Sequence, residues 1–79
     1  MRTVYVNIGT VAAVKDFNFK ACQQRFDVDI ASGRYIIDAK SLMGVLSLDL
    51  SKPIEVRIAA DGADVEDFLD DIKEYIVEE

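Results

Sequence analysis

The sequence predicts an α+β fold in which one open sheet of four strands is covered on a single face by three helices, in the order βαββαβα. Two patterns carry this prediction. Four segments alternate apolar and polar residues or are rich in β-branched residues, as strands are, and three others suit helices. The chain has 79 residues, which is enough for one domain with a small hydrophobic core.

The first strand and the first helix are predicted near the N-terminus. Residues 3–8 alternate, and Gly9 ends the strand. Its residues expected on one face are Val4, Val6 and Ile8. A helix is predicted from about Val11 to Arg25, because this stretch contains neither glycine nor proline. The apolar residues at helical intervals, expected on its inner face, are Val11, Val14, Phe19, Cys22 and Phe26. Phe17 fits neither face well.

The other three strands follow. Residues 27–31 and 34–38 are rich in β-formers, and Ser32 and Gly33 between them have turn chemistry, so these segments predict a hairpin. Residues 54–60 show the clearest alternation and are expected in the centre of the sheet. Their inward residues are Ile54, Val56 and Ile58.

A short helix is predicted within residues 40–48, between the hairpin and the last strand. Ser41 is a good N-cap, since its hydroxyl can accept a hydrogen bond from a backbone N–H two or three residues further on. So short a helix cannot turn all its large apolar side chains inward, and some of this surface should be available to a partner. The residues concerned are Leu42, Met43, Val45 and Leu46.

The last helix is predicted to run from Asp64, a plausible N-cap, to the C-terminus. Asp67 lies in its first turn, where negative charge suits the helix dipole. Its apolar stripe comprises Val65, Phe68, Leu69, Ile72 and Ile76. The acidic residues of this segment are expected to form a solvated face and not a metal site. They are Asp64, Glu66, Asp67, Asp70, Asp71, Glu74, Glu78 and Glu79.

Composition restricts the function. Fifteen acidic against nine basic residues give a net charge of −6, which disfavours nucleic acid or anionic membrane as the primary partner. The single cysteine and the absence of a signal-peptide pattern or long apolar segment favour a cytoplasmic protein. No histidine base, activated nucleophile or glycine-rich phosphate loop accompanies the carboxylates, so we expect neither an enzyme nor a cofactor.

The order of elements, together with residues 40–48 (KSLMGVLSL) and residues 58–64 (IAADGAD), resembles HPr, the histidine-containing phosphocarrier protein of the bacterial sugar phosphotransferase system (PTS). The resemblance extends from about Asp27 to the C-terminus and is weaker before it. It implies an open-faced β-sandwich with a four-stranded antiparallel sheet and three helices on one face, formed by a single HPr-like domain over residues 1–79.

In this family a histidine that opens the first helix, in a motif of the form G-[IL]-H-[AT]-R-P-A, receives a phosphoryl group from enzyme I. The matching stretch here places Ala12 at the histidine, Val14 at the arginine and Lys15 at the proline. The chain contains no histidine. The resemblance therefore implies a histidine-less, Crh-like member that cannot carry a phosphohistidine.

The family has a second site, a serine at the short helix that a dedicated ATP-dependent kinase phosphorylates in low-GC Gram-positive bacteria. That serine matches Ser41. The resemblance implies two protein partners, the serine kinase and a transcription regulator of the catabolite-control type. The partner-binding residues that it implies are Lys40, Leu42, Met43, Val45 and Leu46. The family's arginine that helps to hold the regulator is missing, because Val14 takes its place.

Several alternatives stay open at this point. Ser41 could be a helix cap without any kinase. The protein could also be a phosphocarrier that uses a residue other than histidine, or a domain that associates without phosphate. Asp16, just inside the first helix, could mimic the charge of phosphohistidine. The sequence does not determine the identity of the partner, the host lineage or the oligomeric state.

Overall fold

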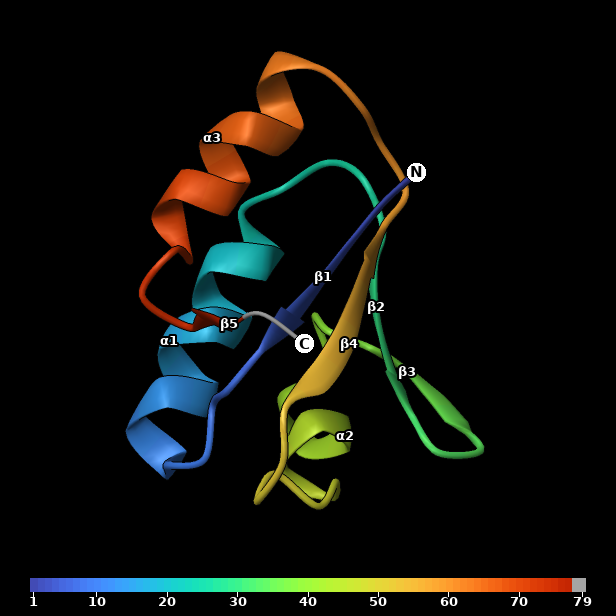
Figure 1. Cartoon of the computed structure of the whole chain (residues 1–79), viewed down its shortest axis with the longest axis vertical. Coiled ribbons are helices and arrows are strands. Elements are labelled where there is room, and N and C mark those ends of the chain that lie inside the picture. Colours follow the sequence, from blue (N-terminus) through green and yellow to red (C-terminus); the bar gives the residue numbers. More distant parts are fainter. Residues whose placement is uncertain (78–79) are drawn as a thin grey trace.

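The computed structural model describes residues 1–77, and Figure 1 shows how its elements are arranged. The helices are α1 (Val11–Cys22), α2 (Leu42–Leu46) and α3 (Ala63–Asp71). The strands are β1 (Arg2–Val6), β2 (Val28–Ser32), β3 (Tyr35–Asp38), β4 (Ile54–Ile58) and β5 (Ile76–Val77). The seven predicted elements are all present, and β5 is an addition.

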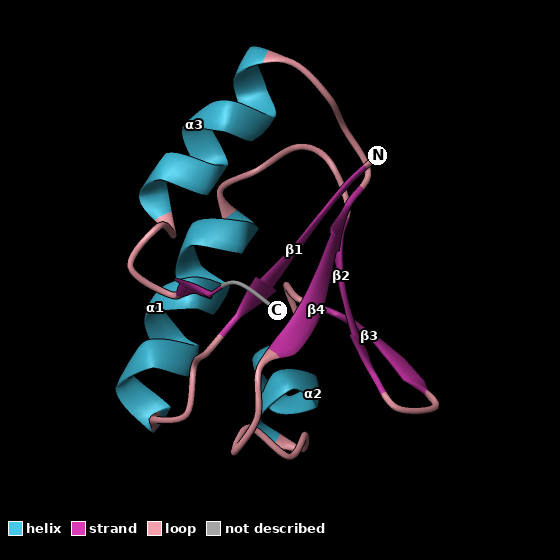
Figure 2. Ribbon diagram, in the orientation of Figure 1, coloured by secondary structure: helices cyan, strands magenta, loops and turns pink. Residues whose placement is uncertain are grey.

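The strands form one antiparallel sheet in the order β3-β2-β4-β1-β5, and the three helices lie on a single face of it (Figure 2). The predicted α+β class and the open sheet are therefore confirmed. The β4 strand lies in the centre, as its alternation predicts, and buries Ile54, Val56 and Ile58. Within residues 1–77, the other face of the sheet carries no helix.

The end of the chain differs from the prediction. Helix α3 ends at Asp71, so the expectation that it runs on through Val77 is wrong. The last two residues of the predicted helix, 78–79, lie outside the described residues. Ile76 and Val77 pair instead with Val6 and Tyr5 of β1, which makes the sheet five-stranded. Ile76 packs against the core in this strand, as it would in a longer helix. The apolar spacing of the sequence therefore could not distinguish the strand from the helix.

The start of α3 also differs. Its N-cap is Gly62 and not Asp64, and no side chain in the described part of the chain caps the helix. Gly62 has a φ of 89°, which L side chains rarely adopt, so a glycine is favoured where the chain turns into the helix. Asp64 lies one position into the first turn, where its charge still suits the dipole.

Helix α1 presents a different face to the core from the one expected. It buries Val14, Phe17 and Ala21, whereas Val11, Phe19 and Cys22 are exposed. The expectation that these three residues face inward is wrong.

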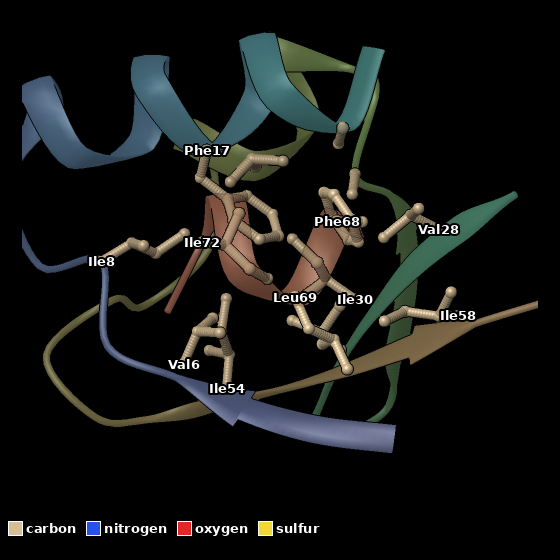
Figure 3. Packing of buried hydrophobic residues seen from close by; sticks show 14 of the residues in the cluster. Val6, Ile8, Phe17, Val28, Ile30, Ile54, Ile58, Phe68, Leu69 and Ile72 are labelled. Carbon is tan, nitrogen blue, oxygen red and sulfur yellow. The ribbon is translucent and has the colours of Figure 1, made fainter. Parts of the chain in front are cut away.

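The reason lies in the core between the sheet and the helices (Figure 3), where the rings of Phe17 and Phe26 both pack on Phe68 of α3. Their centroids lie 6.4 and 5.9 Å from that of Phe68. Burying Phe17 turns Phe19, two residues along the helix, toward solvent.

Candidate functional site

Ser41 is the N-cap of α2, as predicted. Its side chain is exposed, and its Oγ accepts a hydrogen bond from the backbone N–H of Gly44 at 3.3 Å. The Ser41 carbonyl accepts from the N–H of Val45 at 3.0 Å, which starts the helical ladder. The hydroxyl therefore has a structural role while it remains open to solvent.

Gly44 fixes α2 against the sheet. A Cβ at this position would lie 2.7 Å from Cγ2 of Ile37 on β3 and 3.2 Å from Oγ of Ser41. Only a residue without a side chain lets the two elements approach so closely. A side chain at position 44 would therefore crowd both β3 and the capping hydroxyl of Ser41.

The apolar residues predicted to bind a partner divide between surface and core. Met43 is 78% exposed and Leu46 is 38% exposed, while Leu42 is partly buried. Val45 is fully buried, so its expected contact with a partner is wrong. A helix that lies on a sheet must turn one side inward, and Val45 occupies that side.

Lys40, the remaining predicted binding residue, is bonded to the segment just after α1. Its ammonium group donates to the carbonyl oxygen of Gln24 at 2.9 Å, and its backbone N–H donates to Oδ1 of Asp38 at 2.9 Å. The Lys40 cation is thus held in the structure by a backbone carbonyl, and an acidic side chain lies three residues before Ser41.

The position expected for the carrier histidine is exposed at the start of α1. Ala12 is the second residue of the helix, and Thr10 caps it by accepting from the N–H of Ala13 at 3.1 Å. The methyl side chain of Ala12 offers no nucleophile for a phosphoryl group.

The helix pair α1 and α2 exposes more apolar surface than the sequence predicts. Val11 is 59% exposed and Phe19 is 61% exposed on α1. The two helices are joined where the Asn18 side-chain amide donates to the carbonyl of Ala39 at 3.0 Å, just before α2. One signal could have revealed this surface: Phe17 and Phe19 are two residues apart and cannot both face the core of one helix.

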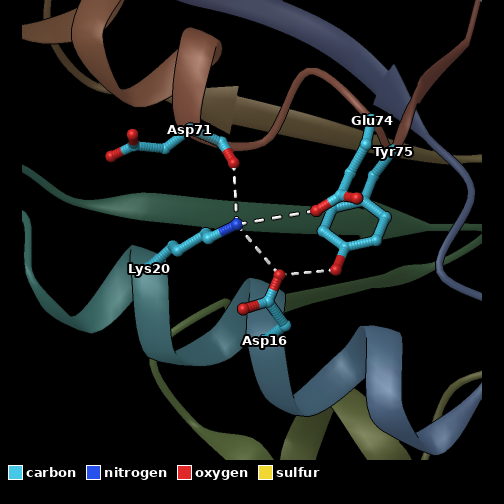
Figure 4. A network of polar contacts seen from close by, with 5 residues as sticks. All are labelled: Asp16, Lys20, Asp71, Glu74 and Tyr75. Atoms are coloured by element: carbon cyan, nitrogen blue, oxygen red, sulfur yellow. Dashed lines mark hydrogen bonds and ion pairs between the residues drawn. The ribbon is translucent and has the colours of Figure 1, made fainter.

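On another side of α1, a polar network joins the helix to the segment after α3 (Figure 4). Oδ2 of Asp16 accepts from the Tyr75 hydroxyl at 2.5 Å and lies 2.9 Å from Nζ of Lys20. Nζ of Lys20 also donates to the Asp71 carbonyl at 2.9 Å and lies 3.6 Å from Glu74. The network holds the C-terminal segment against α1.

These contacts change the acid–base behaviour of the network. The hydrogen bond from Tyr75, followed by that from Lys20, lowers the pKa of Asp16 below its ordinary value. The same Asp16 contact raises the pKa of Tyr75 and of Lys20. Because the Asp16 charge is compensated within the protein, it is poorly placed to imitate a phosphohistidine.

The acidic residues expected on the outside of the C-terminal segment are exposed as far as the structure describes them. These are Asp64, Glu66, Asp67, Asp70, Asp71 and Glu74, whereas Glu78 and Glu79 lie outside the described residues. Within residues 1–77, no helix has the length and apolar character needed to cross a bilayer.

The fold is a small α+β module with an exposed serine, Ser41, at the start of the short helix α2. The family model described as "PTS HPr component phosphorylation site" matches residues 12–78. The chain therefore belongs to the HPr family of the phosphotransferase system. Members of this family are phosphocarriers and not enzymes, which confirms the predicted family and the predicted absence of enzyme activity.

Solved structures share the fold. The HPr-C-His protein of Thermoanaerobacter tengcongensis superposes with a TM-score of 0.73 at 20% sequence identity, over 94% of this chain and 89% of that one. The histidine-containing phosphocarrier protein of a mycoplasma gives a TM-score of 0.67 at 17% identity, over 92% and 86% of the two chains. The sequence of this chain has diverged far within a conserved architecture.

Proposed function

We propose that residues 1–79 form a single HPr-like domain that acts in the bacterial cytoplasm as a regulatory, protein-binding module of the phosphotransferase system. The observation that carries the proposal is a combination of two features. The chain has no histidine, yet it has an exposed serine, Ser41, at the start of a helix that exposes Met43 and Leu46. A domain without the carrier residue can still offer a surface to other proteins.

In this proposal a serine kinase phosphorylates Ser41, and the phosphorylated surface binds a transcription regulator of the catabolite-control type. Family membership supports contact with other proteins of the phosphotransferase system. The contact surface comprises the exposed apolar residues of α1 and α2, namely Val11, Phe19, Met43 and Leu46. Apolar side chains supply the area, and the phosphate supplies a charge-dependent contact.

The surroundings of Ser41 explain how a phosphate would act. The added group carries about −1.5 to −2 charges. The N–H of Gly44 that now reaches the hydroxyl is available to a phosphate oxygen. The Lys40 ammonium could reach the phosphate only by breaking its hydrogen bond to the Gln24 carbonyl, and the negative Asp38 carboxylate repels the phosphate. The phosphate would therefore stay exposed, available to cationic groups of a partner.

The first test is whether Ser41 is phosphorylated. The purified protein is incubated with ATP and the serine kinase of its own organism, and the intact mass is measured. We expect one added phosphate on the native protein and none on Ser41→Ala. Ser47→Ala is the matched control, because Ser47 is an exposed serine at the other end of α2 and should leave phosphorylation unchanged. Absence of phosphate on the native protein would leave Ser41 as a helix cap alone.

The second test separates a phosphate-dependent switch from association without phosphate. Binding to the regulator is compared for the phosphorylated protein, the unmodified protein and Met43→Ala. The proposal requires tighter binding after phosphorylation and weaker binding by Met43→Ala. Equal binding with and without phosphate would favour an association domain that uses the same apolar surface.

A carrier that uses another residue is tested directly. Labelled phosphoenolpyruvate and enzyme I would transfer label to such a protein. We expect no label, since no histidine is present. Stable incorporation would replace the regulatory proposal by the carrier alternative.

A further inference from the structure

The β3 strand forms one edge of the sheet. It is the first strand in the order β3-β2-β4-β1-β5, so among residues 1–77 it pairs on its β2 side alone. Figure 2 shows the β2–β3 hairpin extending away from α1 and α3. An edge strand offers backbone N–H and C=O groups to any further strand.

The register shows which groups are offered. Tyr35 is opposite Ser32 and Ile37 is opposite Ile30, and beyond them the N–H of Ala39 donates to the carbonyl of Val28 at 2.8 Å. In an antiparallel pair, residues alternate between bonding to one neighbour and facing the other. Tyr35 and Ile37 therefore bond to β2, and the intervening Ile36 points its N–H and C=O outward.

Asp38 follows the same alternation and also points its backbone outward. Its carbonyl is already used, because it accepts from the N–H of Ser41 at 3.0 Å. The available backbone groups of the edge are thus the N–H and C=O of Ile36 and the N–H of Asp38. This is enough for a short added strand.

The side chains of this edge do not protect it. Tyr35 is 68% exposed and Ile36 is 61% exposed. The strand contains neither lysine nor proline, the residues that commonly guard edges. Ile36 lies on the sheet face that carries no helix, opposite Ala31 of β2, so the exposed apolar area extends across two strands.

Two carboxylates lie beside this apolar area, and the nearby cations are Arg34 in the hairpin turn and Arg57 on β4. Asp38 is directly opposite Asp29 on the same open face. Arg57 is opposite Asp29 on β4 but is ion-paired with Glu55. Asp38 accepts a hydrogen bond from the backbone N–H of Lys40. Within residues 1–77 no ion pair involves either carboxylate. Like charges directly opposite each other in a sheet are unfavourable, and a cation placed between them would relieve the repulsion.

We propose that the β3 edge binds an extended segment of another protein as an added strand. That segment carries an apolar residue opposite Ile36 and a lysine or arginine two positions along, opposite Asp38. Residues two apart lie on the same face of a strand, so both reach the open face together. A second copy of this chain is a poor occupant, because each copy carries a net charge of −6. The inference is independent of the α2 surface and of Ser41 phosphorylation.

The test uses a synthetic peptide of this pattern, acetyl-TKTVTKTVT-amide, titrated into the isotope-labelled full chain and followed by amide NMR. We expect saturable shifts confined to residues 29–38, with half-saturation at or below about 1 mM. The matched peptide acetyl-TETVTETVT-amide should give no saturation. Replacing Asp29→Asn together with Asp38→Asn should weaken binding about fivefold and remove most of its salt dependence.

A pair of variants locates the site. Ile36→Lys guards the edge and should weaken binding at least about tenfold. Met43→Lys adds the same charge on α2 and should change binding less than about twofold. Equal binding of the glutamate peptide, or shifts centred on α3, would overturn the proposal. So would a dimer in sedimentation that Ile36→Lys abolishes, since it would assign the edge to a second copy.

Discussion

Helices α1 and α3 cover the same sheet but expose different kinds of side chain to solvent. Helix α3 buries Val65, Phe68 and Leu69 and exposes an almost wholly acidic surface. Helix α1 buries Val14, Phe17 and Ala21 and yet exposes Val11 and Phe19. A helix with one apolar stripe can bury only that side against the sheet. A helix with apolar residues on several sides can bury one side in the core and still expose apolar surface to a partner protein.

The largest expected effect tests this difference within α1. Phe17→Ala should lower the free energy of unfolding by about 3 to 5 kcal/mol, because it empties a fully buried site against Phe68. Phe19→Ala removes the same side chain from the surface and should stay within about 0.5 kcal/mol of the native protein. Urea denaturation measures both. Similar losses for the two variants would mean that Phe19 also packs in the core.

The next effect tests where the apolar stripe of α3 ends. Ile72 is fully buried although it lies just beyond the helix. Ile72→Ala should cost about 2 to 5 kcal/mol in urea denaturation. The neighbouring Lys73→Ala should cost less than about 0.5 kcal/mol, because Lys73 is exposed. Comparable costs at both positions would contradict the burial described here.

A smaller effect compares how the two helices begin. Thr10 caps α1 with its side chain, and Thr10→Ala should lower the free energy of unfolding by about 1 kcal/mol. Gly62 begins α3 through its backbone conformation, so Gly62→Ala should cost about 1 to 3 kcal/mol through strain at positive φ. Thermal and urea unfolding measure both. A stabilising Gly62→Ala would show that the turn adopts another conformation.

The smallest effect concerns the network that links α1 to the segment after α3. The pKa of Asp16 is lowered in the folded protein, so its contribution to stability is present above the ordinary aspartate pKa of about 3.9 and is lost as the pH falls through the folded value. Asp16→Asn should therefore reduce the loss of stability on acidification below about pH 4.

The measurement is the urea midpoint followed from about pH 6 to about pH 2. Tyr75→Phe removes the hydroxyl that lowers the Asp16 pKa most. Like Asp16→Asn, it should reduce the loss of stability as the pH falls. If both variants lose stability on acidification as the native protein does, the network does not stabilise the folded state.

Much of the fold could be predicted because the local sequence patterns favour the same strands and turns that the sheet contains. The alternation of residues 54–60 places β4 in the centre, where three of its side chains are buried. The turn chemistry of Ser32 and Gly33 gives the β2–β3 hairpin, and Gly33 has the positive φ that such turns favour. The cap at Ser41 was predicted from residue type alone, and its hydrogen bond to Gly44 confirms it.

The errors arise where one pattern suits two structures. Ile72 and Ile76 continue the helical stripe of α3, but pairing with β1 offers Ile76 the same burial in an added strand. In α1, Phe17 and Phe19 compete for the core, and Phe68, far along the chain, decides between them. At the candidate site, the sequence selected the four apolar residues around Ser41 but could not say that Val45 is the buried one.

The sequence by itself determined the order of the first seven elements, the acidic charge, the missing histidine and the capping serine, because each depends on residue type or on local periodicity. The tertiary structure decided which side of α1 is buried, how the chain ends and which side chains of α2 face solvent. These depend on contacts between residues far apart in the chain, and the packing of a core chooses among alternatives that local patterns leave equal.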